Sequence, residues 1–157
     1  PPIGAYASSP AFAEGWALYA ERLGAEMGLF SDDLSRLGGL ASEALGAARL
    51  VVDTGLALYG WERQRAIDYL VENAGLPPEL AAAEVDRYAA RPGDAAAYLL
   101  GALEIRRLRE GAERALGPRF DVRAFHDAVL EDGAVPLPVL RARIARFVGE
   151  RQAGAGR

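Results

Sequence analysis

Glu14 is the first residue of this sequence that could do chemistry, and it lies in an aromatic stretch. Phe12, Trp16 and Tyr19 recur around it at helical spacing, which places Glu14 one turn inside a predicted helix. A carboxylate in such surroundings needs a partner to be tolerated. One interpretation is an acidic residue that the helix dipole favours near the N-terminus, and the other is a functional carboxylate.

Arg49 and Asp53 form a second candidate group. They lie one turn apart in an apolar run, Arg-Leu-Val-Val-Asp-Thr-Gly-Leu over residues 49–56. This pattern predicts a largely buried helix that carries an internal charged pair. The pair could fix the register of the helix as a structural ion pair, or it could brace a catalytic face from behind.

Tyr98 is the third candidate, in a segment of small residues. Asp94 and Tyr98 share one face of a predicted helix, and Gly101 beside them leaves room for close backbone approach. A phenol in this setting is either a packed side chain with a satisfied hydroxyl or a group that faces open space.

His126 is the only histidine. One histidine is too little for a zinc site, which needs three or four protein ligands, so a structural hydrogen bond is the simpler interpretation. The sequence contains no cysteine, which excludes disulfides, cysteine metal sites and a cysteine nucleophile. It also lacks a Gly-rich phosphate loop, EF-hand spacing and a Ser/His/Asp arrangement.

Helical periodicity between Gly and Pro breakers predicts an all-α fold of about seven helices, with Tyr59 and Trp61 in the core. The predicted helices cover residues 10–27, 31–60, 61–73, 79–90, 94–116 and 121–131, and a last helix begins at Pro136 or Pro138 and ends before Gln152. Residues 1–157 are interpreted as a single helical domain or a fragment, with a flexible lead-in over residues 1–8 and a flexible tail over residues 152–157.

The composition is that of an ordinary soluble chain, with 51% apolar and 25% charged residues among 157. The net charge of −4 and the absence of a basic tract argue against nucleic acid as a partner. No apolar run approaches the ~20 residues that span a membrane, and the first residues lack the charged and apolar regions of a signal peptide. The compartment stays open.

Five motifs in order carry a resemblance that extends from Phe12 to about Phe147. They are Phe-x-Glu-Gly-Trp-Ala-Leu-Tyr-x-Glu (12–21), Arg-Leu-Val-Val-Asp-Thr-Gly-Leu (49–56), Glu-Val-Asp-Arg-Tyr (84–88), Pro-Gly-Asp-Ala-x-x-Tyr-x-x-Gly (92–101) and Phe-His-Asp-x-Val-Leu (125–130). Together they resemble the bacterial domain-of-unknown-function family 885. Members of that family resemble zinc metallopeptidases of the gluzincin type.

The resemblance implies roles for particular residues. In gluzincins a His-Glu-x-x-His helix supplies two zinc ligands and the general base, and a later glutamate is the third ligand. Glu14 matches that glutamate, whereas no part of this chain carries His-Glu-x-x-His. The resemblance further implies that Tyr98 donates a hydrogen bond to the tetrahedral intermediate. The substrate-side or supporting residues that it implies are Arg49, Asp53, Asp94 and His126.

Two positions depart from the family pattern. Ala57 replaces a usual His, and Asp94 replaces a usual Gln. These departures favour a protein that keeps the fold without the activity, whereas the intact Glu14 and Tyr98 favour an enzyme.

The implied function is therefore the C-terminal part of a zinc metallopeptidase that hydrolyses peptide bonds. The alternative is a non-catalytic helical binding or scaffolding module of the same fold. Zinc and a peptide substrate are expected in the complete protein, while this chain alone is expected to hold no zinc and to be inactive. Self-association is expected, because the absent half would leave an apolar face bare. The substrate and exo- or endo-cleavage stay open.

Overall fold

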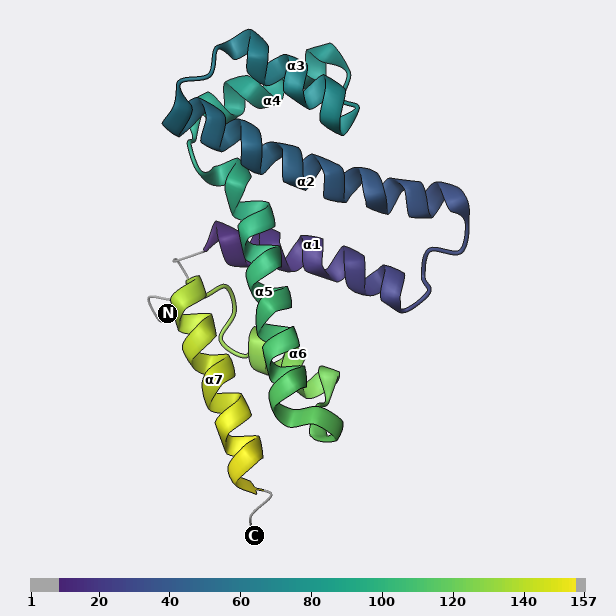
Figure 1. Cartoon of the computed structure of the whole chain (residues 1–157), viewed down its shortest axis with the longest axis vertical. Coiled ribbons are helices and arrows are strands. Elements are labelled where there is room, and N and C mark those ends of the chain that lie inside the picture. The colour runs from purple at the N-terminus through teal and green to yellow at the C-terminus, as the bar shows by residue number, and fades with distance from the viewer. Residues whose placement is uncertain (1–8, 155–157) are drawn as a thin grey trace.

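The computed structural model describes residues 9–154, which form seven α-helices and one short 3₁₀-helix and contain no β-strand (Figure 1). The elements are α1 (Pro10–Glu26), α2 (Asp33–Tyr59), α3 (Arg63–Ala74), α4 (Pro78–Ala90), α5 (Asp94–Leu116), η2 (Gly117–Arg119), α6 (Val122–Leu130) and α7 (Leu137–Ala153). The predicted all-α fold is confirmed for these residues.

Local signals in the sequence set most helix ends. Pro10 begins α1, where its missing N–H costs nothing. Asp32 caps α2, because its carboxylate accepts a hydrogen bond of 2.7 Å from the Ser35 N–H. The same helix ends at Gly60, whose φ of 61° is the left-handed conformation that glycine adopts without strain.

The helices form two groups that α5 connects. In one group α2, α3 and α4 pack around a core that includes Val52 and Tyr88. In the other group α1, α5, α6 and α7 enclose a core around Phe12 and Phe125. Figure 1 shows α5 running from the α3–α4 end to the α6–α7 end and crossing α1 on the way. The first half of α5 therefore carries Tyr98 to the place where the two groups meet.

Helix α7 continues to Ala153, two residues beyond its predicted end, and the Gln152 side-chain amide donates a hydrogen bond of 3.2 Å to the Ala115 carbonyl. The flexibility of the tail over residues 152–157 stays a prediction. The predicted core position of Tyr59 is wrong. Tyr59 is 75% exposed rather than buried, because α2 ends there and no helix covers its last turn. The predicted lead-in over residues 1–8 and the last three residues of the tail lie outside the described residues.

The described helices include none that combines the length and the apolar character required to cross a bilayer.

Candidate functional site

The candidate site is built on a crossing of α1 and α5 at which two backbones touch. A Cβ atom added to Gly15 would lie 2.4 Å from the Gly101 Cα, and one added to Gly101 would lie 1.6 Å from the Ala11 carbonyl oxygen. Only glycine fits at both positions, so the two helices pack at backbone contact. Because Glu14 precedes Gly15 and Tyr98 lies one turn before Gly101, this crossing brings Glu14 and Tyr98 together.

Burial and two neighbouring charges determine the pKa of the Tyr98 hydroxyl. Burial raises this pKa above its usual value of 10.0, and the negative charge of the neighbouring Glu14 raises it further. The positive charge of Arg49 acts in the opposite direction, with its guanidinium carbon 4.8 Å from the centroid of the Tyr98 ring. Tyr98 is therefore a protonated phenol at neutral pH, placed between a carboxylate and a guanidinium.

Arg49 is held by Glu84 of α4. Its Nη2 donates a hydrogen bond of 3.1 Å to the Glu84 carboxylate, which also accepts 2.8 Å from Arg87 and 2.6 Å from the Tyr88 hydroxyl. Burial alone would raise the pKa of Glu84, but the hydrogen bonds from Arg87 and Tyr88 and the charge of Arg49 lower it to about 2. Burial and the bond to Glu84 raise the pKa of Tyr88 to about 12.

The predicted Arg49–Asp53 pair does not form. Asp53 is 2% exposed and accepts hydrogen bonds from the backbone N–H of Gly93 (2.9 and 3.0 Å) and of Ala96 (2.9 Å). Asp53 of α2 thus caps the N-terminus of α5. The residue at the N-cap position of α5 itself is Gly93, which has no side chain that could do so. The two side chains separate because α4 offers Arg49 a carboxylate while the open N-terminus of α5 attracts Asp53.

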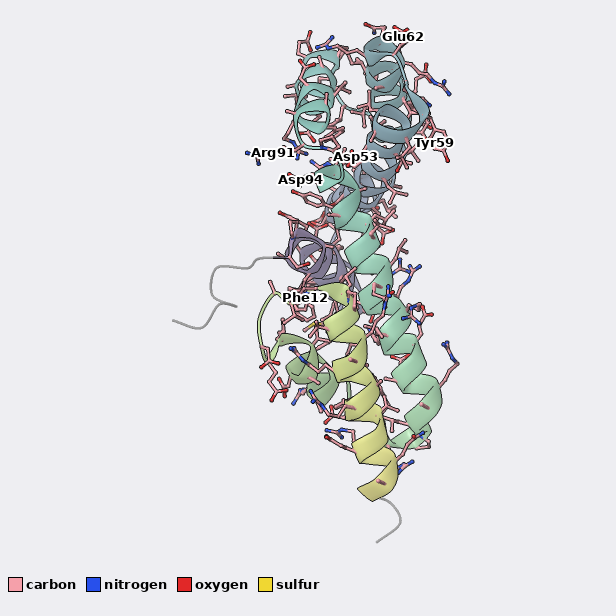
Figure 2. The ribbon with its side chains drawn as sticks, turned by 90° about the vertical axis from the view of Figure 1, so that its left-hand side faces the viewer. Phe12, Asp53, Tyr59, Glu62, Arg91 and Asp94 are labelled. Carbon is pink, nitrogen blue, oxygen red and sulfur yellow. The ribbon has the colours of Figure 1, made fainter. Side chains whose placement is uncertain are left out.

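Asp94 and Ala57 lie beside this arrangement rather than within its hydrogen bonds. Asp94 is the first residue of α5 and partly exposed, where a negative charge favours the helix N-terminus. Figure 2 shows Asp53 and Asp94 close together at this end of α5. Ala57 is exposed on the last turns of α2, so no side chain reaches the site from that position.

His126 lies on another face of α1. Its Nε2 forms a hydrogen bond of 2.7 Å with the Tyr19 hydroxyl, which also accepts a hydrogen bond of 3.2 Å from Arg109. Burial and the charge of Arg109 lower the pKa of His126. Its ring also packs 5.6 Å from the ring of Trp16. Glu14 precedes Trp16 by two residues, which turns it to a different side of α1, and the structure does not bring His126 to Tyr98.

Glu84, Arg87 and Tyr88 also belong to the site, although their motif did not predict this. The motif Glu-Val-Asp-Arg-Tyr reads as a charged flank of α4, yet Tyr88 is 1% exposed. The available signal was the spacing of Glu84 and Tyr88, four residues apart, which lets a carboxylate and a phenol meet on one helix face.

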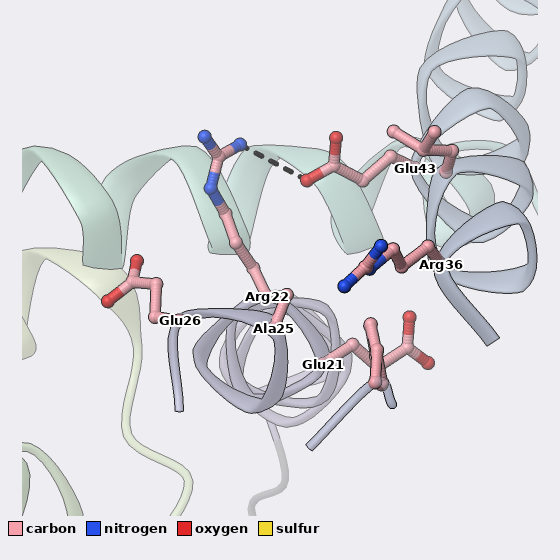
Figure 3. A pocket seen from close by; sticks show the side chains of 9 residues that line it. Glu21, Arg22, Ala25, Glu26, Arg36 and Glu43 are labelled. Atoms are coloured by element: carbon pink, nitrogen blue, oxygen red, sulfur yellow. Dashed lines mark hydrogen bonds and ion pairs between the residues drawn. The ribbon is translucent and has the colours of Figure 1, made fainter. Parts of the chain in front are cut away.

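A pocket of about 430 Å³ lies elsewhere, between α1 and α2 at the far end of their hairpin. Figure 3 shows Arg22 of α1 reaching across it to Glu43 of α2, at 3.1 Å. Neither Glu14 nor Tyr98 lines it, so the pocket is separate from the candidate site.

The described residues contain no group of three or more His, Cys, Asp or Glu side chains placed to hold a metal ion. Glu84 and Asp53 are already engaged, the first by two arginines and the second by backbone N–H groups. Glu14 forms no ion pair among residues 9–154. Its carboxylate could therefore bind a ligand at this site.

Two solved structures are similar to this chain. One is a candidate lipoprotein from Colwellia psychrerythraea, with a TM-score of 0.87 and 44% sequence identity over 90% of this chain and 24% of that chain. The other is a candidate lipoprotein of unknown function from Shewanella oneidensis, with a TM-score of 0.81 and 25% identity over 86% of this chain and 25% of that chain. The chain thus spans about a quarter of the length of each.

No curated protein matches this sequence. Residues 1–144 match the family described as bacterial protein of unknown function (DUF885), and the match includes the whole candidate site from Glu14 to Tyr98. The chain belongs to this family.

Proposed function

We propose that this chain is the C-terminal part of a zinc-dependent metallopeptidase, in which Glu14 supplies one metal ligand and Tyr98 donates a hydrogen bond to the reacting carbonyl oxygen. The observation that carries the proposal is the placement of a carboxylate without an ion pair beside a protonated phenol. Both are fixed by the contact between Gly15 and Gly101.

The donor set of this chain fits zinc as a contributor of one ligand. Catalytic zinc takes three protein ligands and keeps a fourth position open, so the remaining ligands and the general base must come from a His-Glu-x-x-His helix outside these residues. When bound, zinc polarises the scissile carbonyl and activates a water molecule.

The residues of this chain have separate tasks in the proposal. Glu14 binds the metal as a carboxylate. Tyr98 keeps its proton at neutral pH, since burial and Glu14 raise its pKa, and it can therefore donate to an oxygen that becomes negative. Arg49 lies over the Tyr98 ring, with its guanidinium carbon 4.8 Å from the ring centroid.

The test uses the protein extended to the length of its relatives. Tyr98→Phe keeps the ring and removes the donor, so we expect kcat to fall by ~10²–10³-fold with little change in KM. Glu14→Ala should deplete bound zinc and abolish hydrolysis together. The 157-residue chain alone should hold no stoichiometric zinc and cleave no peptide. Full kcat in zinc-loaded Tyr98→Phe would refute the role of the phenol.

A non-catalytic binding module is the second candidate, and one observation favours it. Four leucines at the free end of the α1–α2 hairpin are between 61% and 79% exposed: Leu29, Leu34, Leu37 and Leu40. Apolar clusters of this kind mark contact surfaces in soluble proteins. We expect self-association of the chain through this end, and Leu34→Glu with Leu37→Glu should abolish it in sedimentation velocity. A chain that stays monomeric at high concentration would contradict this candidate.

A further inference from the structure

We propose that Glu84 is a positioning residue for Tyr98, which it controls by holding Arg49 over the tyrosine ring. This inference rests on the proposed function for its catalytic consequence, whereas the positioning itself concerns only residues of this chain. Glu84 lies on α4, Arg49 on α2 and Tyr98 on α5, so the contact passes across three helices.

The hydrogen bonds of Glu84 are the first support. Its carboxylate accepts five: two from Arg49 (3.3 and 3.1 Å), two from Arg87 (3.2 and 2.8 Å) and one from Tyr88 (2.6 Å). Arg49 Nε also donates 3.3 Å to the Tyr88 hydroxyl. The planar fork of Arg49 therefore has a defined orientation, which a single surface contact would not give.

Burial separates this network from ordinary surface pairs. The side chains of Arg49 and Glu84 are 19% and 25% exposed, whereas Arg63 and Asp86, which also join α4 to a neighbouring helix, are 55% and 59% exposed. A partly buried ion pair costs desolvation and adds little net stability, so orientation of its members is the better explanation for it. The Arg63–Asp86 pair is the matched control.

The connection to Tyr98 is geometric. The Arg49 guanidinium carbon lies 4.8 Å from the centroid of the Tyr98 ring, on the face of the ring. A guanidinium fixed at one face restricts the ring and hence the direction of its hydroxyl. A hydrogen-bond donor in an active site needs placement to within about 0.5 Å and 10–20°. If Glu84 is lost, Arg49 becomes free to leave the ring and the hydroxyl loses this restraint.

The first experiment measures positioning without any activity. In the isotope-labelled chain, NMR follows the Arg49 Nε–H signal and the ring signals of Tyr98. Glu84→Gln keeps an acceptor oxygen but removes the charge, and we expect at least ~10-fold faster solvent exchange of the Arg49 Nε–H and shifted Tyr98 ring signals. Arg49→Lys keeps the charge without the fork and should shift the same ring signals. Asp86→Asn should change neither.

The second experiment measures the effect on catalysis, in the zinc-loaded protein extended to the length of its relatives. Glu84→Gln should lower kcat ~10-fold or more with KM nearly unchanged, because it disturbs a contact that matters mainly in the transition state. In the Tyr98→Phe background the same change should have no further effect on kcat, since the two residues act as a unit. Asp86→Asn should leave kcat and KM as they are.

The outcomes separate the two proposals. Tyr98 signals that do not respond to Glu84→Gln or Arg49→Lys overturn the positioning role, whatever the enzyme does. The positioning role is also overturned if the fold-losses of kcat in the two single variants multiply in the double variant, because Glu84 then acts independently of Tyr98. If the wild-type protein hydrolyses no peptide, the proposed function fails, and the NMR result still decides the role of Glu84.

Discussion

Replacing Gly101 with alanine tests the contact on which the candidate site depends. The added Cβ would lie 1.6 Å from the Ala11 carbonyl oxygen, and ordinary contact begins at 3.4 Å. The difference, 3.4 − 1.6 = 1.8 Å, is the minimum distance by which the two atoms must separate. The obstructing atom is backbone, so no rotation of a side chain can relieve the clash.

The expected loss of stability follows from the packing that the α1–α5 contact supports. Overpacking costs about 1–3 kcal/mol where side chains can adjust. Here whole helices must part, which also loosens the packing of Phe12 and Ile105 in the shared core. Alanine returns only about 0.5–1 kcal/mol through its better helix propensity. We expect Gly101→Ala to lower the free energy of unfolding by about 3 kcal/mol, a large part of the stability of a domain of this size.

Urea unfolding measures this loss, with an expected fall in the midpoint of about 1–2 M. Gly111→Ala is the matched control, because Gly111 lies in the same helix and a Cβ there meets nothing within 4 Å. It should raise stability by about 0.5–1 kcal/mol. If both variants change stability equally, the backbone contact of α1 and α5 does not exist as described.

Three further predictions concern capping and titration. Asp53→Ala removes the acceptor of two backbone N–H groups at the start of α5 and should cost about 2–4 kcal/mol in urea unfolding, more than the loss of the exposed cap Asp32. Hydrogen bonds from arginines lower the pKa of Glu104 from 4.5 to about 2. The contribution of Glu104 to the stability of the fold is therefore complete above pH 4.5 and is lost as the pH falls toward 2. Glu104→Gln should reduce the fall of Tm between these two pH values. Burial lowers the pKa of His126 from 6.5, so the stability of the wild-type protein should fall as the pH drops below 6.5. A His126→Phe variant whose Tm keeps the same pH dependence would contradict this lowered pKa.

The sequence determined the helices because their signals act within one turn of the chain. Pro10 and Asp32 begin helices, Gly60 and Gly75 end them in the left-handed conformation, and apolar spacing fixes the buried faces. Most helix ends differ from the prediction by one or two residues: α1, α2 and α6 are shorter than predicted, whereas α7 extends further at its C-terminal end. The residue types of the candidate site, above all Glu14 and Tyr98, were also readable from their motifs.

Only the tertiary structure decided which of these side chains meet. Arg49 and Asp53 are one turn apart, yet their partners Glu84 and Gly93 lie 35 and 40 positions away. A spacing of one helical turn places two side chains within reach of each other. A partner on a neighbouring helix can still bind one of them instead, because a buried charge is most stable where hydrogen bonds replace its lost hydration. The position of α1 against α5 depends in turn on the contact of their two backbones, which no local pattern encodes.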